Sequence, residues 1–290
     1  MELFLESTAM SLNLKVGIVG LGAIGLEIAK TIDSKKLPNM NLVSVSSRDL
    51  TKAQNKLENL RSKPRLTTID ETVTLSDIII ESAPAAIFEE IAAATIEAGK
   101  ILIPASVGAL LPRMHLIDRA KETGAKVIVP TGALIGLDAV RAAAEGKVES
   151  ITLKTRKPPT GLAGAPHLIE NNISVENLTE PKLVFEGTAR DGAKGFPANV
   201  NVAAALSLAG IGPDRTTLQI WADPSVDRNM HTIEVEADSA RFTMTIENIP
   251  TIENPKTGKI TALSLIATLR RLTAPPVSYT HLTLPTIYSV

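Results

Sequence analysis

Three closely spaced glycines near the start of the chain could bind the phosphates of a dinucleotide. The run Gly20-Leu21-Gly22-Ala23-Ile24-Gly25 follows the apolar segment 16–19 and precedes the helix-like segment 26–30. In such a turn the first glycine permits a tight bend, the second lets the backbone approach the pyrophosphate, and the third lets helix and strand pack closely. The anion then binds N–H groups at the helix start. An ordinary turn before a helix is the alternative, but the flanking elements favour a nucleotide site. We predict cofactor contacts at Gly20, Gly22, Ala23, Ile24 and Gly25.

A serine and an arginine follow the second expected strand, where the adenosine ribose of a dinucleotide lies in such domains. Ser47 and Arg48 suit a ribose 2′-phosphate, because a guanidinium matches phosphate geometry and a hydroxyl adds a donor. The next residue, Asp49, could instead bind an unphosphorylated ribose or cap the helix expected over residues 50–60. We therefore expect NADP or NAD as the cofactor, with Ser47 and Arg48 as contacts and NADP slightly preferred.

Composition argues against several other classes of partner. The 30 basic and 31 acidic residues give a net charge of -1, so no positive excess indicates nucleic acid or an acidic membrane surface. The chain has no cysteine, which excludes disulfides and thiolate chemistry and fits a cytoplasmic location. No apolar stretch reaches the roughly 18 residues of a membrane span. His115, His167 and His281 form no metal-ligand spacing, so we expect no metal. A small-molecule partner is the expectation.

The glycine turn requires a strand and a helix on either side, and the first half of the chain has this alternation. Short apolar runs of β type are separated by longer segments of helical character, which is typical of a parallel sheet with crossover helices. The expected strands cover residues 16–19, 42–46, 66–69, 77–81, 100–103 and 126–129. The pattern predicts an α/β fold with a doubly wound Rossmann domain over residues 14–135.

The second half of the chain has a different pattern of apolar and polar residues. A helix is expected over residues 136–145, followed by alternating strands at 151–155, 183–185, 217–221, 231–236 and 240–247. These elements predict an α+β domain over residues 136–257, with a mostly antiparallel or mixed sheet. A final helix over residues 258–274 is expected to return to the first domain. Residues 1–13 and 276–290 are expected to be disordered or non-native tails.

Several motifs give the chain a resemblance to a known family. It resembles the NAD(P)-dependent L-aspartate dehydrogenases, whose two-domain plan is similar to that of dihydrodipicolinate reductase and homoserine dehydrogenase. The resemblance covers residues 14 to 274. Its motifs are Pro130-Thr131-Gly132-Ala133-Leu134-Ile135-Gly136-Leu137-Asp138, Arg156-Lys157-Pro158-Pro159, Phe196-Pro197-Ala198-Asn199-Val200-Asn201, Asp223-Pro224 and Arg228-Asn229-Met230-His231.

Site residues follow from this resemblance position by position. Ala133 and Asn199 match cofactor contacts of the second region, and His231 matches the catalytic histidine. Lys194 and Asn201 are nearby candidates for holding the substrate. A plain strand-to-helix loop is the alternative at Ala133, and a helix cap is the alternative at Asn199.

His231 also has an argument from its own surroundings. It begins a strand whose alternation places His231, Ile233 and Val235 on one face. A histidine on an apolar face is more often a core residue, but the imidazole suits proton transfer near neutral pH. Together with the family match at the preceding Arg228-Asn229, the resemblance implies that His231 acts as a general base.

The resemblance implies oxidative deamination of L-aspartate to iminoaspartate, and then to oxaloacetate and ammonia. It also implies a homodimer and a possible supply of the imine to NAD biosynthesis. The two carboxylates of the substrate need cations, and those available are Arg156, Lys157, Lys194 and Arg228, although each of them could be a solvated surface charge. Two other functions stay open: an NADP-dependent reductase or dehydrogenase of another imine or semialdehyde, and a non-catalytic dinucleotide redox sensor.

Overall fold

The computed structural model describes residues 13–197, 200–251 and 258–273, and within these ranges the strands form two sheets. The first sheet has the order β3-β2-β1-β4-β5-β6, and all its neighbouring strands run parallel. Its strands are β1 (Leu14–Val19), β2 (Met40–Ser46), β3 (Arg65–Leu66), β4 (Ile78–Glu81), β5 (Ile101–Pro104) and β6 (Lys126–Val127). The strand order reverses between β1 and β4, so the expected doubly wound sheet is confirmed.

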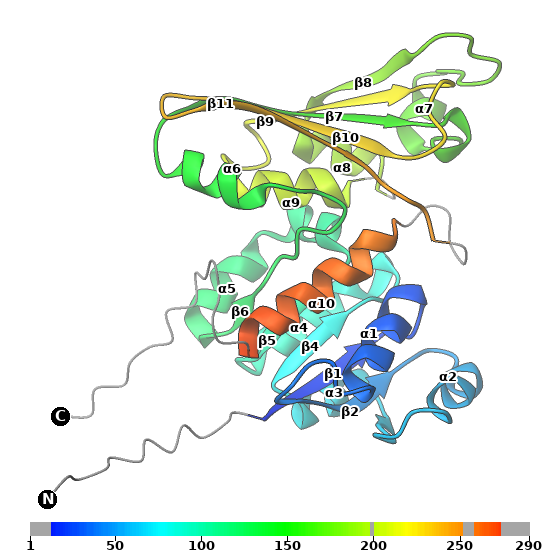
Figure 1. Ribbon diagram of the computed structural model, residues 1–290, viewed down its shortest axis with the longest axis vertical. Coiled ribbons are helices and arrows are strands. Elements are labelled where there is room, and N and C mark those ends of the chain that lie inside the picture. The colour runs from blue at the N-terminus through cyan, green and yellow to red at the C-terminus, as the bar shows by residue number, and fades with distance from the viewer. Residues whose placement is uncertain (1–12, 198–199, 252–257, 274–290) are drawn as a thin grey trace, which may run out of the picture.

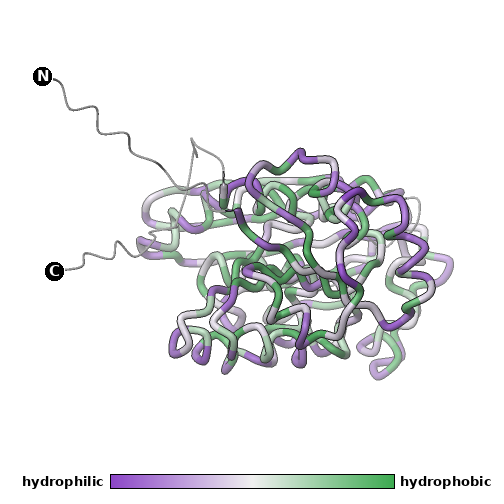
Figure 2. Tube along the Cα trace, turned by 90° about the horizontal axis from the view of Figure 1, so that it is seen from below, coloured by the Kyte–Doolittle hydropathy of each residue, from purple (hydrophilic) through white to green (hydrophobic). Residues whose placement is uncertain are grey.

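Helices cover both faces of this sheet because alternate strand residues point to opposite faces. Ile78 and Ile80 of β4 pack on one side with α1 and α2, and Ile79 packs on the other with α3, α4 and α5. The helical segments are α1 (Ala23–Asp33), α2 (Leu50–Leu57), α3 (Ile69–Leu75), α4 (Phe88–Glu97) and α5 (His115–Thr123), with 3₁₀ turns η1 (Ala85–Ile87) and η2 (Val107–Arg113). Figure 2 shows the hydrophobic stretches of the trace gathered inside and the hydrophilic ones at the outer loops.

The third expected strand, over residues 66–69, is wrong beyond Leu66. Thr68 ends the extended segment because its side chain accepts a hydrogen bond from the backbone N–H of Glu71, at 3.2 Å. The Glu71 carboxylate in turn accepts from the backbone N–H of Thr68 at 3.2 Å, which completes a capping box. Residue 69 therefore opens α3 instead of ending a strand.

The second sheet has the order β11-β10-β7-β9-β8, and it is mixed because β7 pairs in parallel with β9 and the other pairs are antiparallel. Its strands are β7 (Val148–Lys157), β8 (Lys182–Thr188), β9 (Thr216–Ala222), β10 (Met230–Ala237) and β11 (Arg241–Glu247). The helical segments of this half are α6 (Leu137–Ala144), η3 (Pro159–Gly161), α7 (Pro166–Glu170), α8 (Ala189–Gly195) and α9 (Asn201–Ala209). The mixed sheet agrees with the expected α+β architecture.

One face of the second sheet is turned toward the first half of the molecule. Figure 1 shows α6 and α9 on that side of the sheet. Their apolar residues form one core cluster with inward residues of the sheet, such as Leu153 and Ile233, and with Leu111 of η2. The division between residues 135 and 136 falls between β6 and α6, and it stays a prediction.

The last described helix, α10 (Lys259–Thr273), lies against the first half. Its buried residues Leu265 and Leu269 share a core cluster with Ile28 of α1 and Val16 of β1. The Arg270 Nη1 atom donates to the carbonyl oxygen of Lys36 at 2.9 Å. The polypeptide therefore leaves the first half after β6 and comes back to it at the end.

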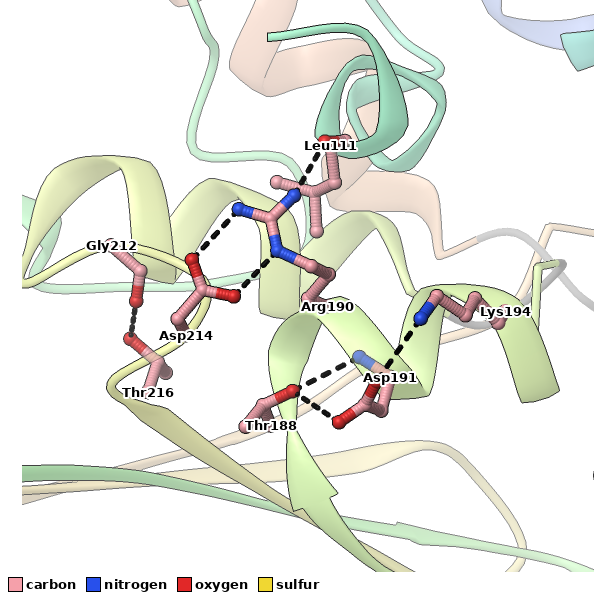
Figure 3. A network of polar contacts seen from close by, with 8 residues as sticks. All are labelled: Leu111, Thr188, Arg190, Asp191, Lys194, Gly212, Asp214 and Thr216. Atoms are coloured by element: carbon pink, nitrogen blue, oxygen red, sulfur yellow. Dashed lines mark hydrogen bonds and ion pairs between the residues drawn. The ribbon is translucent and has the colours of Figure 1, made fainter.

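A polar network also joins the two halves, as Figure 3 shows. The Nε and Nη2 atoms of Arg190, on α8, bind the Asp214 carboxylate at 2.5 and 2.8 Å. Its Nη1 atom donates to the carbonyl oxygen of Leu111, on η2, at 3.1 Å. The ion pair with Asp214 raises the pKa of Arg190 and holds the guanidinium toward η2.

In the part of the chain that the structure describes, no helix is long and apolar enough to span a bilayer.

Candidate active site

The glycine turn lies at the carboxyl end of β1, and its geometry fits a pyrophosphate. Gly20 has a φ of +97°, and a Cβ there would lie 2.5 Å from the carbonyl oxygen of Ser82. A Cβ on Gly25 would collide with the carbonyl oxygen of Gly20. At Gly22, by contrast, no atom of the described residues lies within 4 Å of the Cβ position, apart from those of its neighbours in the chain, so a ligand can approach the backbone there. Gly22 also caps α1 without a side-chain hydrogen bond, and no acidic residue lies in the first turn of that helix.

Two charged residues after β2 have different roles: one caps a helix and the other is an exposed cation. The Oδ1 atom of Asp49 accepts a hydrogen bond from the backbone N–H of Lys52 at 2.9 Å, so this carboxylate caps α2. Arg48 is exposed and Ser47 is partly buried next to it. The arrangement leaves the guanidinium, and not the capping carboxylate, as the group that can turn toward a ribose phosphate.

A buried carboxylate holds the neighbouring strand ends together. Glu81, at the end of β4, is fully buried, and its Oε2 atom accepts from the Ser106 N–H at 2.9 Å. Its Oε1 atom accepts from the Ala83 N–H and from the Ser106 hydroxyl, each at 3.0 Å. Burial raises the pKa of Glu81, and these hydrogen bonds oppose that rise. Because both loops are tied to one side chain, the edge of the sheet beside the glycine turn is rigid.

A cavity of about 300 Å³ lies between this edge and the second sheet. The first half contributes Ile24 from the glycine turn, Ala105 and Val107 after β5, and Pro130, Gly132 and Ala133 after β6, and the second half contributes Lys157, Asn201, Val202, Ala205, Asn229, His231 and Asn248. Gly258, Thr261 and Leu265 complete the lining. The wall combines apolar residues with a few polar groups, as small-molecule sites do.

His231 reaches this cavity from β10. The predicted alternation is confirmed, because His231, Ile233 and Val235 are buried and the intervening residues are less so. The His231 Nδ1 atom lies 3.0 Å from the hydroxyl oxygen of Thr155. Thr155 is on β7, where it is the antiparallel partner of His231. This contact orients the ring and leaves Nε2 as the nitrogen available to a ligand.

The protonation of His231 is set by its surroundings. Burial lowers the pKa of His231 to about 3, and the positive charge of Lys157 contributes to the same shift. The imidazole is therefore neutral at physiological pH, which is the form that accepts a proton.

The four cations named from the sequence differ in their positions. Lys157, the last residue of β7, is only 6% exposed and lines the cavity, so it is not a solvated surface charge. Arg156 lies 3.2 Å from Asp223, and Lys194 lies 3.3 Å from Asp191 with 75% of its side chain exposed. Neither of these two lines the cavity with His231. Arg228 borders an adjoining cavity.

The remaining predicted residues are placed as follows. Ala133 and Asn201 both line the cavity, and the Asn201 Oδ1 atom accepts from the Gly108 N–H at 2.9 Å. Ala23 lies one residue before Ile24 and borders a separate groove between α1 and α10. Asn199 lies outside the described residues. Within those residues, no group of three or more metal-binding side chains is close enough together to hold a metal ion.

Asn248 is a cavity residue that the sequence analysis did not name, and Asn229 was named there only within the motif around His231, without a role. The Asn248 side chain donates through Nδ2 to the carbonyl oxygen of Ala133 at 3.2 Å, and its backbone N–H donates to the carbonyl oxygen of Asn229 at 2.8 Å. Asn248 thus joins the end of β11 to the loop after β6. Its only signal in the sequence is a polar residue directly after a strand, which is too common to single it out.

The sequence of this chain is similar to known proteins over both of its halves. Residues 138–272 match the family model described as aspartate dehydrogenase, C-terminal, and residues 20–130 match the NAD-binding domain of homoserine dehydrogenase. An L-aspartate dehydrogenase from Bradyrhizobium diazoefficiens is 54% identical over 92% of this chain and 94% of its own length. L-aspartate dehydrogenase 3 from Bordetella bronchiseptica is 50% identical over 91% of this chain and 96% of its own length.

A solved structure shares the fold. The aspartate dehydrogenase of Thermotoga maritima superposes with a TM-score of 0.69 at 24% identity, over 91% of this chain and 98% of that one. The two family models together cover the glycine turn and the histidine strand, and the relatives of high identity span more than nine tenths of the chain. By these matches the chain belongs to the L-aspartate dehydrogenase family.

Proposed function

We propose that this chain oxidises L-aspartate with NAD⁺ or NADP⁺. In the balanced reaction, aspartate, oxidised cofactor and water give oxaloacetate, ammonium, reduced cofactor and a proton. The observation that carries the proposal is the single cavity in which Ile24 of the glycine turn, Ala133 and His231 meet. The names of the relatives support aspartate as the substrate.

The residues at the strand ends suit a nicotinamide dinucleotide. The open approach to Gly22 and the N-terminus of α1 would hold the pyrophosphate, and Ala133 would lie at the nicotinamide end. Arg48 and Ser47 would contact a 2′-phosphate, which supports use of NADP, since Asp49 is engaged as a helix cap. When bound, the nicotinamide supplies the acceptor for the hydride that leaves the substrate Cα.

His231 would act as the general base of the reaction. In the tautomer that carries its proton on Nδ1, the ring donates to the Thr155 oxygen, and the Nε2 lone pair can accept a proton from the substrate amine. The same nitrogen can then activate the water that adds to the imine carbon. Substrate carboxylates beside Lys157 would offset the positive charge that lowers the pKa of His231, and this makes the ring a stronger base in the complex.

The decisive experiment measures reduced cofactor formed from L-aspartate by the wild type and by His231→Ala. We expect turnover to fall about 10²- to 10⁴-fold in the variant, the range for loss of a general base. Binding of NADP⁺ by calorimetry should stay unchanged, because the substituted ring belongs to β10 whereas the glycine turn that would hold the pyrophosphate follows β1. The matched control is His115→Ala, since His115 is an exposed histidine at the start of α5. Equal turnover in the two variants would remove the assignment.

The same assay separates the other two functions. Activity on a different amine, imine or semialdehyde without activity on aspartate would indicate the alternative dehydrogenase. Dinucleotide binding without any turnover would indicate the redox sensor. Both of these outcomes would contradict the proposal.

A homodimer is also part of the proposal. Figure 1 shows α6 and α9 on one side of the second sheet only. The opposite face carries partly buried side chains such as Gln219, Trp221 and Glu234, and no helix of the described residues covers it in Figure 1. A second copy of this face would cover them. The molar mass in solution tests this assembly.

A further inference from the structure

A second cavity of about 270 Å³ adjoins the one that contains His231. Four residues line both cavities and so lie at the junction: Lys157, Asn229, Asn248 and Gly258. Beyond the junction the second cavity is lined by Thr160, Asp227 and Arg228. It contains neither His231 nor any residue of the glycine turn, so the reaction itself does not explain it.

Two cations border this second cavity, and they differ in how well solvent screens them. Lys157 is only 6% exposed, so its charge acts across a poorly solvated wall. The Arg228 side chain is 35% exposed, and its Nε and Nη2 atoms bind the Asp227 carboxylate at 2.6 and 2.7 Å. This pairing raises the pKa of Arg228, and Glu247 adds to the rise.

The ion pair with Asp227 orients the Arg228 guanidinium but cancels little of its positive charge in the cavity. Asp227 is 76% exposed, so water screens its charge. No acceptor among the described residues engages the Arg228 Nη1 atom. A guanidinium fixed on two nitrogens therefore keeps a third donor for an anion.

We propose that the second cavity binds the side-chain carboxylate of a dicarboxylic amino acid, with Arg228 as the residue that selects for that carboxylate. The inference rests on the proposed function, because it takes the amino acid to react beside His231. In this arrangement Lys157 at the junction binds the α-carboxylate, and the substrate side chain passes Asn229 into the second cavity. Thr160 contributes a hydroxyl donor. The substrate class is then an amino acid with a carboxylate at Cγ, and its amide analogue is rejected.

The kinetic test compares L-aspartate with L-asparagine, which differs only in the side-chain amide. In Arg228→Gln we expect kcat/KM for aspartate to fall about 10- to 100-fold, mostly through KM, because a charge-assisted hydrogen bond is lost. The kcat/KM for asparagine should change little in Arg228→Gln, so the ratio of kcat/KM for aspartate to that for asparagine should fall. Arg241→Gln is the matched control, since Arg241 also binds a carboxylate through Nε at 2.6 Å, at the exposed start of β11 and away from both cavities. Equal effects of the two substitutions on kcat/KM, or a fall in kcat with unchanged KM, would overturn the proposal.

Equilibrium binding separates this inference from the proposed function. Calorimetry with succinate and with butyrate, both in the presence of the oxidised cofactor, compares one and two carboxylates without turnover. We expect the wild type and Arg241→Gln to bind succinate more tightly than butyrate. Arg228→Gln should bind succinate and butyrate weakly and with equal affinity. If the wild type does not oxidise aspartate but shows this Arg228-dependent preference, the anion site stands and the proposed function fails. A preference for succinate that survives in Arg228→Gln would refute the site.

Discussion

The proton affinity of His231 depends on where its ring lies. On the surface a histidine titrates near pH 6.5, but this ring is buried in the wall of the cavity, beside Lys157. Thr155 holds one ring nitrogen at 3.0 Å, so the orientation is fixed as well as the charge. A neutral, oriented imidazole is what a general base needs before the substrate binds.

This burial predicts how the stability of the protein depends on pH. The folded pKa of His231, about 3, lies below its ordinary value of 6.5, so between these values the unfolded chain binds more protons. The contribution of His231 is therefore complete above pH 6.5 and is lost as the pH falls toward 3. We expect it to add a slope of up to about 1.4 kcal/mol per pH unit to the free energy of unfolding.

Urea unfolding between pH 7 and pH 4 measures this slope. His231→Gln has no titrating ring, so its stability should fall less steeply with acid than that of the wild type. Parallel curves for the two proteins would show that the ring is solvated. The comparison of slopes is insensitive to any loss of stability that is the same at every pH.

At the scale of the elements, two glycines in the turn between β1 and α1 have different roles. Gly25 is small because the carbonyl of Gly20 lies against it, and that contact packs the helix on the strand. Gly22 has open space beside it. One glycine therefore serves the fold, and the other leaves room for a ligand.

Alanine substitutions at these two positions should have opposite consequences. Gly22→Ala should keep the melting temperature within about 2 °C of the wild type and weaken dinucleotide binding at least about tenfold, since the methyl group occupies the approach to the phosphates. Gly25→Ala should lower the melting temperature by several degrees, because its Cβ would overlap the Gly20 carbonyl. Thermal unfolding and NADP⁺ calorimetry on both variants make the comparison. Unaltered affinity in Gly22→Ala would mean that the phosphates lie elsewhere.

At the scale of the whole molecule, the cavity exists because the two halves are held in one arrangement. Residues of η2 belong to the same core cluster as the second sheet, and α10 packs against α1. The Asn248 side chain connects the two halves beside the cavity itself. Any substitution that loosens these contacts should affect the site even at a distance from it.

Arg190→Met tests this coupling. Methionine retains the aliphatic packing but removes the hydrogen bond from Arg190 to the Leu111 carbonyl, so we expect a loss of about 1 kcal/mol and a melting temperature lower by about 2–4 °C. The KM for aspartate should rise, since η2 borders the cavity through Val107. Arg119→Met, which removes an exposed arginine paired with Glu97 and Glu122 within the first half, is the control. A rise in KM as large in this control as in Arg190→Met would argue against coupling through η2.

Much of the fold was predictable because its signals are local. The glycine spacing marks the turn after β1, and the alternation at 231, 233 and 235 places the histidine on the inner face of β10. Helix α3 was missed because its start depends on reciprocal hydrogen bonds between Thr68 and Glu71, and the apolar pattern alone read as a strand. Asp49 shows the same limit, since a cap and a ribose contact need the same residue type.

The sequence by itself determined the class of the fold, the order of most strands and helices, and the face on which a side chain such as His231 lies, since these follow from periodicity and turn chemistry between near neighbours. Only the tertiary structure decided which side chains meet. Lys157 became a buried cation beside His231, and Asn248 met the carbonyl of Ala133, 115 residues away. Such meetings depend on how two sheets and their helices pack, and the free energy of that packing is spread over the whole core instead of being written in any short segment.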